Sequence, residues 1–154
     1  MKPEFKQRIG SALLNPAWVC FVWFGMTAGV SMLATPARFA APLVTRVIAL
    51  DIGRVVFAVL NKAELIALII LLVVVRASKR SRRWWVVSAL LVLIVLAQSI
   101  WLLPELADRT AQIVSGGEPP PSIAHAAYSS LELIKLGLLF CLGMSALMSD
   151  SSTQ

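Results

Sequence analysis

The chain has 154 residues, of which 58% are hydrophobic and 14% are charged, and its formal net charge at pH 7 is +6. Soluble domains average about 25% charged residues, so this composition excludes an ordinary soluble enzyme or binding domain. Long apolar runs occupy most of the chain and leave little for a separate soluble domain. The sequence therefore predicts an all-α fold, a polytopic membrane four-helix bundle with short interfacial helices, as a single membrane domain over residues 1–154.

Four apolar runs approach or exceed the roughly 20 residues that a helix needs to cross a bilayer. The segment before them, residues 2–14, places apolar side chains on one helical face and predicts a short amphipathic helix on the inner membrane surface. The first run is longer than the roughly 7–15 apolar residues of a signal peptide, so we expect no cleavage. The predicted spans are residues 17–35, 55–75, 84–103 and about 124–148.

Gly25 and Gly29 in the first predicted span form a small-xxx-small pattern, which permits close approach of another helix. We expect these two glycines to serve helix packing within the monomer rather than self-association.

The connections between the predicted spans differ in composition. Residues 43–50 mix apolar side chains with an arginine and predict a short interfacial helix outside the membrane. The short arginine-rich loop at residues 76–83 predicts an antiparallel hairpin of the second and third spans. Residues 104–123 begin with a proline and end in SGGEPPPS, which predicts a stiff external loop.

The basic residues are divided unequally between the two sides of the predicted membrane. Four lie on one side, namely Arg38, Arg46, Arg54 and Arg109. Eight lie on the other, namely Lys2, Lys6, Arg8, Arg76, Lys79, Arg80, Arg82 and Arg83. This is the positive-inside pattern, so we expect a multi-pass protein of a bacterial inner (cytoplasmic) membrane with both termini cytoplasmic. The basic loop is then a partner of anionic lipid head groups in the bilayer, and nucleic acid is not an expected partner.

Two of the predicted spans carry polar and ionisable residues at helical spacing, so each set lies on one stripe. The stripe of the fourth span is His125, Tyr128, Glu132 and Lys135, and that of the second is Arg54, Asn61 and Glu64. Both stripes begin at the predicted external end and stop near mid-depth, which argues against a continuous pore.

An ionised side chain near the bilayer centre costs about 2.5–3.5 kcal/mol, so these groups need partners. Counting inward from the external end places Glu64 level with Lys135, and we predict that the two side chains pair. Gln98 on the third span could close one wall. The resulting ligand or ion groove, open to the outside between spans 2 and 4, is predicted to contain Arg54, Asn61, Glu64, His125, Tyr128, Glu132 and Lys135.

Three interpretations of the stripes stay open at this stage. The groove can bind a ligand or take part in transport or proton relay, since ionisable residues inside a membrane are functional candidates. The charges can instead act as a structural clasp that fixes helix register. The chain can also be a non-catalytic accessory or assembly subunit of a larger membrane complex, with another membrane protein or a second copy as its partner.

Metal and cofactor chemistry is not expected. His125 is the only histidine and has no Cys or Met ligand near it in the pattern, so we predict no metal, no haem and no other cofactor. Ser129 and Ser130 belong to no recognisable acid–base–nucleophile triad, which favours a protein that is not an enzyme. Cys20 and Cys141 lie within spans without CxxC spacing and are predicted to stay reduced.

At GVSMLATPARFAAPLV and HAAYSSLELIKL the sequence resembles the transmembrane protein 205-like family of small four-span membrane proteins of bacteria and eukaryotes. The resemblance rests on Pro36 and Phe39 ending the first span, an amphipathic stretch before the second, and His125 opening the fourth. It covers most of the chain and implies a four-helix bundle without an established biochemical activity. Glu132 and Lys135 do not map onto the family pattern, so their role rests on the charge argument.

Overall fold

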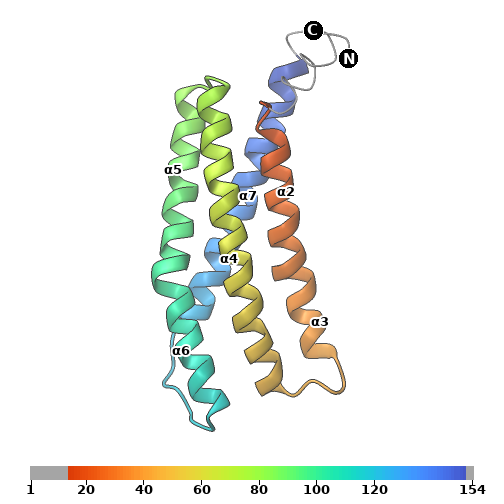
Figure 1. Cartoon of the computed structure of the whole chain (residues 1–154), viewed down its shortest axis with the longest axis vertical. Coiled ribbons are helices and arrows are strands. Elements are labelled where there is room, and N and C mark those ends of the chain that lie inside the picture. The colour runs from red at the N-terminus through yellow and green to blue at the C-terminus, as the bar shows by residue number, and fades with distance from the viewer. Residues whose placement is uncertain (1–13, 152–154) are drawn as a thin grey trace.

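The computed structural model describes residues 14–151, and every regular element in this range is helical. The elements join into four long helices, shown in Figure 1. The first comprises α2 (Ala17–Ala28), the π-helical segment η1 (Gly29–Ala34) and α3 (Thr35–Ala40). The second is α4 (Arg46–Ala77), and the fourth is α7 (Ala124–Ser151). The third comprises α5 (Arg82–Ala97), the π-helical segment η2 (Gln98–Leu102) and α6 (Leu103–Val114).

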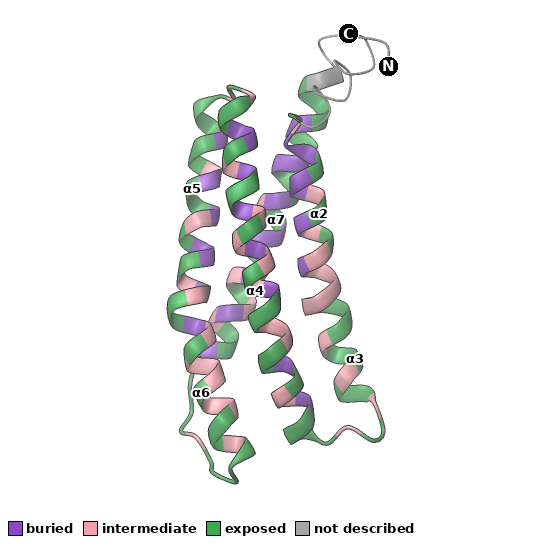
Figure 2. Ribbon diagram, viewed as in Figure 1, coloured by how far each residue is buried: buried purple, intermediate pink, exposed green. Residues whose placement is uncertain are grey.

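All four long helices are long and apolar enough to cross a membrane. The predicted all-α fold is therefore confirmed, and the chain is a small multi-pass membrane protein. Many large apolar side chains on the outside of the bundle remain exposed, with Leu33 at 72% and Leu93 at 64%, which suits a surface in contact with lipid rather than water. Figure 2 shows this exposed outer surface around buried inward-facing positions.

The helices run up and down around a ring in the order α2, α4, α5, α7, with each helix packed against the next and α7 packed back against α2. The α4–α5 turn therefore lies at the same end of the bundle as the start of α2 and the end of α7 (Figure 1). We call this the turn end. In such a ring α4 and α7 lie diagonally, because short antiparallel connections place alternate helices across the bundle axis, and the predicted contact of Glu64 with Lys135 joins them across that axis.

The first and third long helices continue past the prolines that were expected to end them. Pro36 and Pro104 lie in the first turn of α3 and α6, and a π-helical segment comes just before each. Proline lacks an N–H and its ring clashes with the carbonyl four residues earlier, and a widened π turn relieves that clash without ending the helix. The prediction of an external loop over residues 104–123 is therefore wrong up to Val114, where α6 ends.

The interfacial helix predicted at residues 43–50 is not a separate element. Thr45 is the N-cap of α4, and its side chain accepts a hydrogen bond from the backbone N–H of Ile48. From Arg46 the helix continues without a break to Ala77, because no proline or glycine pair interrupts it. The amphipathic segment predicted at residues 2–14 lies outside the described residues except for Leu14, which is exposed.

The core toward the turn end is apolar and tightly packed. Trp23, Leu71, Leu91 and Leu139, one from each long helix, are fully buried there. A close helix contact lies at Gly143 of α7, where an added Cβ would lie 2.8 Å from the Phe21 ring of α2. Cys20 is buried, Cys141 is exposed, and both are free thiols.

The predicted close packing at Gly25 and Gly29 is not seen among the residues that the structure describes. A Cβ added at either glycine would meet nothing within 4 Å in the described structure. The α2–α7 contact is made by the face that carries Phe21, and the small residue that permits it is Gly143 on the other helix.

Candidate functional site

A buried polar network crosses the middle of the bundle, and Lys135 is its centre. The Nζ of Lys135 lies 2.6 Å from Glu64 Oε1 and 2.8 Å from Glu132 Oε2. It also donates a hydrogen bond of 2.8 Å to Gln98 Oε1. An ammonium group has three N–H donors, so each donor of this side chain has an acceptor, although the side chain is 0% exposed.

Glu64 is held by donors from the first long helix as well as by Lys135. Its Oε1 accepts hydrogen bonds from Trp23 Nε1 at 3.0 Å and from Thr27 Oγ1 at 2.8 Å. Its Oε2 is buried and has no hydrogen-bond partner in the described part of the chain. Glu64 therefore depends on α2 for positioning, and its bonds are all made through one oxygen.

Glu132 has partners on both carboxylate oxygens. Ser31 Oγ donates to Oε1 at 2.7 Å, and Gln98 Nε2 donates to Oε2 at 2.8 Å, next to the Lys135 contact. Ser31 lies in η1 and Gln98 in η2. Both π-helical segments thus contribute a side chain to the network, in line with the frequent occurrence of π turns at functional sites.

Each of the four long helices contributes to this network, which holds two carboxylates and one ammonium group. Trp23, Thr27 and Ser31 are spaced by four residues each and lie on one face of the first long helix. Glu132 and Lys135 are three residues apart on α7 and contact each other as well as the other helices. The arrangement ties the four helices together near mid-depth.

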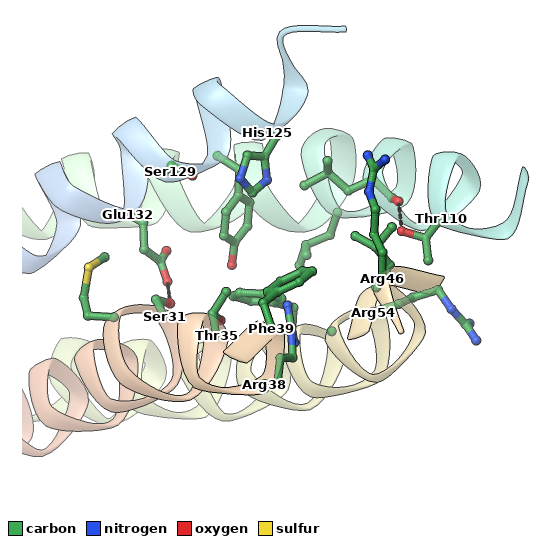
Figure 3. Close-up of a pocket in the computed structure, with 17 residues that line it drawn as sticks. Ser31, Thr35, Arg38, Phe39, Arg46, Arg54, Thr110, His125, Ser129 and Glu132 are labelled. Carbon is green, nitrogen blue, oxygen red and sulfur yellow. Dashed lines mark hydrogen bonds between the residues drawn. The ribbon is translucent and has the colours of Figure 1, made fainter. Parts of the chain in front are cut away.

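A cavity of about 520 Å³ lies on the other side of Glu132, toward the end of the bundle opposite the turn end. We call this the cavity end. Figure 3 shows side chains from α3, α4, α6 and α7 around it. Its polar and charged lining residues are Ser31, Thr35, Arg38, Arg46, Arg54, Thr110, His125, Tyr128, Ser129 and Glu132. Its apolar lining residues are Met32, Phe39, Leu50, Phe57, Leu103 and Leu106, together with Gly53.

The guanidinium of Arg38 packs against two aromatic rings and close to the backbone of α4. Its guanidinium carbon lies 5.2 Å from the centroid of the Phe39 ring and 5.7 Å from that of Phe57, which are distances of cation–π contact. Gly53 leaves room for it, since a Cβ there would lie 2.5 Å from Arg38 Nη2. The Nε of Arg38 is buried and has no partner among the described residues.

The other two arginines of the cavity differ in pairing. Arg54 binds Asp51 through Nη2 at 2.7 Å and through Nε at 3.1 Å, and both side chains are about half exposed. Arg46, at the start of α4, makes no ion pair with any described residue. Two of the three arginines are thus without an acidic partner in this part of the chain.

The structure brings the predicted groove residues together only in part. Glu64 and Lys135 are in contact, as the sequence predicts, but they lie in the buried network and do not line the cavity. Asn61 faces neither: its Nδ2 donates to Ser99 Oγ at 2.8 Å on η2. The predicted groove residues that line the cavity are Arg54, His125, Tyr128 and Glu132.

The location of the groove also needs correction. The sequence predicts it between spans 2 and 4, whereas all four long helices contribute residues to the lining of the cavity. The contribution of the first long helix is not predicted from the sequence, because threonine and serine residues such as Thr27 and Ser31 are common in apolar helices. Their four-residue spacing, with Trp23 one turn earlier, is the signal that could have found them. Arg38 and Arg46 enter the sequence prediction only through the charge distribution that indicates the orientation of the protein in the membrane.

No metal centre is formed by the described residues: they contain no group of three or more His, Cys, Asp or Glu side chains that could hold an ion. The cavity lining presents guanidinium, imidazole, hydroxyl and carboxylate groups against apolar walls.

Comparison of the chain with protein-family models, with curated proteins and with solved structures finds no match. The fold and the site define a small multi-pass membrane protein, and its function has to be argued from the geometry.

Proposed function

We propose that this protein binds a ligand in the cavity and that the buried network is the structural clasp that keeps the cavity in shape. The observation that carries the proposal is the cavity of about 520 Å³ whose lining includes two arginines, Arg38 and Arg46, without an acidic partner among the described residues. This volume lies within the roughly 300–1,000 Å³ of small-molecule sites. A polar or anionic ligand would supply the acceptors that these two guanidinium groups lack within the described residues.

The network supports the structural part of the proposal. Every donor of Lys135 is used, and both oxygens of Glu132 have protein partners. Groups so fully satisfied have little capacity left for a ligand. Glu132 is the one residue that belongs to both the network and the cavity lining, so a change in the clasp will reach the cavity through it.

Binding is favoured over passage through the bundle. Between the network and the turn end, the hydrophobic core is formed by apolar side chains, including Leu71, Leu91 and Leu139. A route for a polar solute would need polar lining there. The protein is therefore proposed as a binding protein of the membrane rather than a channel.

The proposed location is a bacterial inner membrane with the cavity end outside. The arginine-rich α4–α5 turn lies at the same end as the start of α2 and the end of α7 (Figure 1). The positive-inside rule then places that end, and with it both termini, in the cytoplasm. Membership in the transmembrane protein 205-like family is part of this proposal and adds no ligand to it.

The proposal is tested by filling the cavity. Ser129 of α7 lines the cavity, whereas its neighbour Ser130 is exposed and does not. The protein in mild detergent is incubated with a bacterial polar lipid extract and examined by native mass spectrometry for bound non-protein molecules. We expect bound mass on the parent and on the matched control Ser130→Phe, and its loss on Ser129→Phe. Equal binding to both variants, or no binding to the parent, overturns the proposal.

The second candidate function is an accessory subunit. It is favoured by the open space at Gly25 and Gly29, where a neighbouring helix could approach. It predicts a protein partner in fixed stoichiometry when the chain is purified in mild detergent. Replacing both glycines by leucine would then remove that partner, while binding in the cavity would persist.

A further inference from the structure

We propose that the ligand of the cavity is an anionic amphiphile, a molecule with a carboxylate or phosphate head group on an apolar tail. Arg38 and Arg46 bind the head group, and the apolar walls bind the start of the tail. This inference rests on the proposed function, because it names the class of ligand for the same cavity.

The charges around the cavity favour an anion. Arg38 and Arg46 have no acidic partner among the described residues, and the pair Arg54–Asp51 balances itself. Glu132 is the acidic side chain of the lining, and it is already bound by Lys135, Ser31 and Gln98. The unbalanced charge of the lining is therefore positive.

Arg38 has the geometry of a prepared anion site. Phe39 and Phe57 contact its guanidinium, and Gly53 makes room for it on α4. Glycine inside a helix costs about 1 kcal/mol relative to alanine, which is compensated here by the space it provides. A guanidinium whose N–H groups lie in one plane fits the two oxygens of a carboxylate or phosphate, and Arg38 has no acidic partner among the described residues that would compete for it.

The walls favour a ligand that also has an apolar part. Apolar surface in the lining of the cavity comes from the side chains of Met32, Leu50, Leu103 and Leu106. Phe39 is 46% exposed and Met32 is 42% exposed, so the cavity is not sealed from the surroundings of the bundle. An inorganic anion would leave such walls without contact, whereas an acyl chain would cover them.

The depth of the arginines matches that of a lipid head group. At 1.5 Å per residue, the 32 residues of α4 extend about 48 Å, against a hydrocarbon core of about 30 Å. The first turns of α4, which begin at Arg46, therefore extend beyond the hydrocarbon at the cavity end. Glu132, at the other side of the cavity, lies near mid-depth. A ligand with its head at Arg46 and its tail toward Glu132 would have the orientation of a membrane amphiphile.

The test compares matched pairs of probes that differ in charge. Oleate is compared with oleyl alcohol in detergent, and phosphatidylglycerol with phosphatidylcholine in nanodiscs, with inorganic phosphate as a probe without a tail. We expect oleate or phosphatidylglycerol to bind the parent at least about tenfold more tightly than its neutral or zwitterionic counterpart and more tightly than phosphate. Tighter binding of oleate would indicate a free amphiphile as the ligand, and tighter binding of phosphatidylglycerol would indicate a bilayer lipid.

The variants locate the head group. Arg38→Gln and, independently, Arg46→Gln should weaken binding of the anionic probe by about tenfold to a hundredfold, the range of one hydrogen bond to a charged group. Gly53→Ala, which displaces the Arg38 guanidinium but keeps its charge, should also weaken binding. Arg109→Gln removes the same charge from α6 outside the cavity lining and should leave the affinity unchanged.

The outcomes separate this inference from the proposed function. If the neutral probes bind as tightly as the charged ones and Ser129→Phe still abolishes binding, the cavity binds a ligand of another class and only this inference is overturned. The same holds if phosphate alone binds as tightly as oleate and phosphatidylglycerol. If Ser129→Phe leaves the binding of every probe unchanged, both proposals fail.

Discussion

The buried network and the adjacent cavity both contain charged side chains, but these side chains differ in how far they are paired within the described structure. In the network, Lys135 has an acceptor for each of its donors, and both oxygens of Glu132 are bound. In the cavity, Arg38 keeps a buried nitrogen without a partner, and Arg46 has no acidic side chain to pair with in the described structure. The network leaves one carboxylate oxygen, Glu64 Oε2, without a partner among the described residues, whereas Arg38 and Arg46 of the cavity have no acidic partner there unless a ligand binds.

This difference separates a structural role from a binding role. Buried charges that are fully paired and hydrogen-bonded are expensive to disturb, because removing one partner leaves an uncompensated charge. Unmatched charges at a cavity contribute little to the folded state of the free protein. The predictions below test whether stability depends on the network and not on the arginines of the cavity.

The largest effect is expected for Lys135→Met. It leaves the Glu64 and Glu132 carboxylates buried near each other without a cation, and breaking a buried pair in this way costs about 3–5 kcal/mol. We expect a large fall in the midpoint of thermal unfolding in detergent, followed by tryptophan fluorescence. Lys62→Met is the matched control, since Lys62 is exposed on α4 and the loss of a charge on the outer surface of a membrane span should not destabilise the fold. Equal stability of the two variants would refute the structural role of the network.

The charge swap Glu64→Lys with Lys135→Glu is expected to restore little of that loss. A simple pair would tolerate the exchange, but Trp23 and Thr27 donate hydrogen bonds to Glu64, and they cannot do so to an ammonium group. A glutamate at position 135 would also lie beside Glu132, one turn away on α7. Recovery of parental stability in the same unfolding experiment would show that the Glu64–Lys135 contact acts as an isolated pair.

A smaller loss is expected for Thr27→Val, which keeps the shape of the side chain and removes one donor to Glu64. The cost should be about 1.5–3 kcal/mol, the usual range of a hydrogen bond to a charged acceptor. The matched control is Thr110→Val, because the hydroxyl of Thr110 donates only to the backbone oxygen of Leu106 on its own helix. Denaturant titration of the two variants gives the difference, and the absence of a difference would remove Thr27 from the network.

The smallest effect on stability is expected for Arg38→Gln. The substitution loses two cation–π contacts, each about 0.5–1 kcal/mol where exposed, and it removes an unpartnered buried Nε, so the two changes offset to within about 1 kcal/mol. The free protein should therefore unfold close to the parent, while binding of an anionic probe is weakened. A loss of stability as large as that of Lys135→Met would place Arg38 in the structural clasp instead.

The helical fold and part of the site could be predicted from the sequence. Apolar runs of sufficient length give the four long helices, and the 3.6-residue period places Glu132 and Lys135 on one stripe. Counting residues from the predicted external end brought Glu64 level with Lys135, and the two are in contact. The helix ends were missed at Pro36 and Pro104, because the π turns that accommodate a proline have no strong local signal.

What the sequence alone determined is therefore the set of helices, their antiparallel order and the depth of the ionisable groups, because these depend on local apolar length, helical period and the cost of charge in lipid. Only the tertiary structure decided which helices are neighbours, that Trp23, Thr27 and Ser31 complete the network, and that Arg38 and Arg46 meet at one cavity. These contacts depend on the rotation of each helix about its axis. That rotation is set by packing, such as Phe21 against Gly143, and by the widened turns before the prolines, rather than by the residues of any one segment.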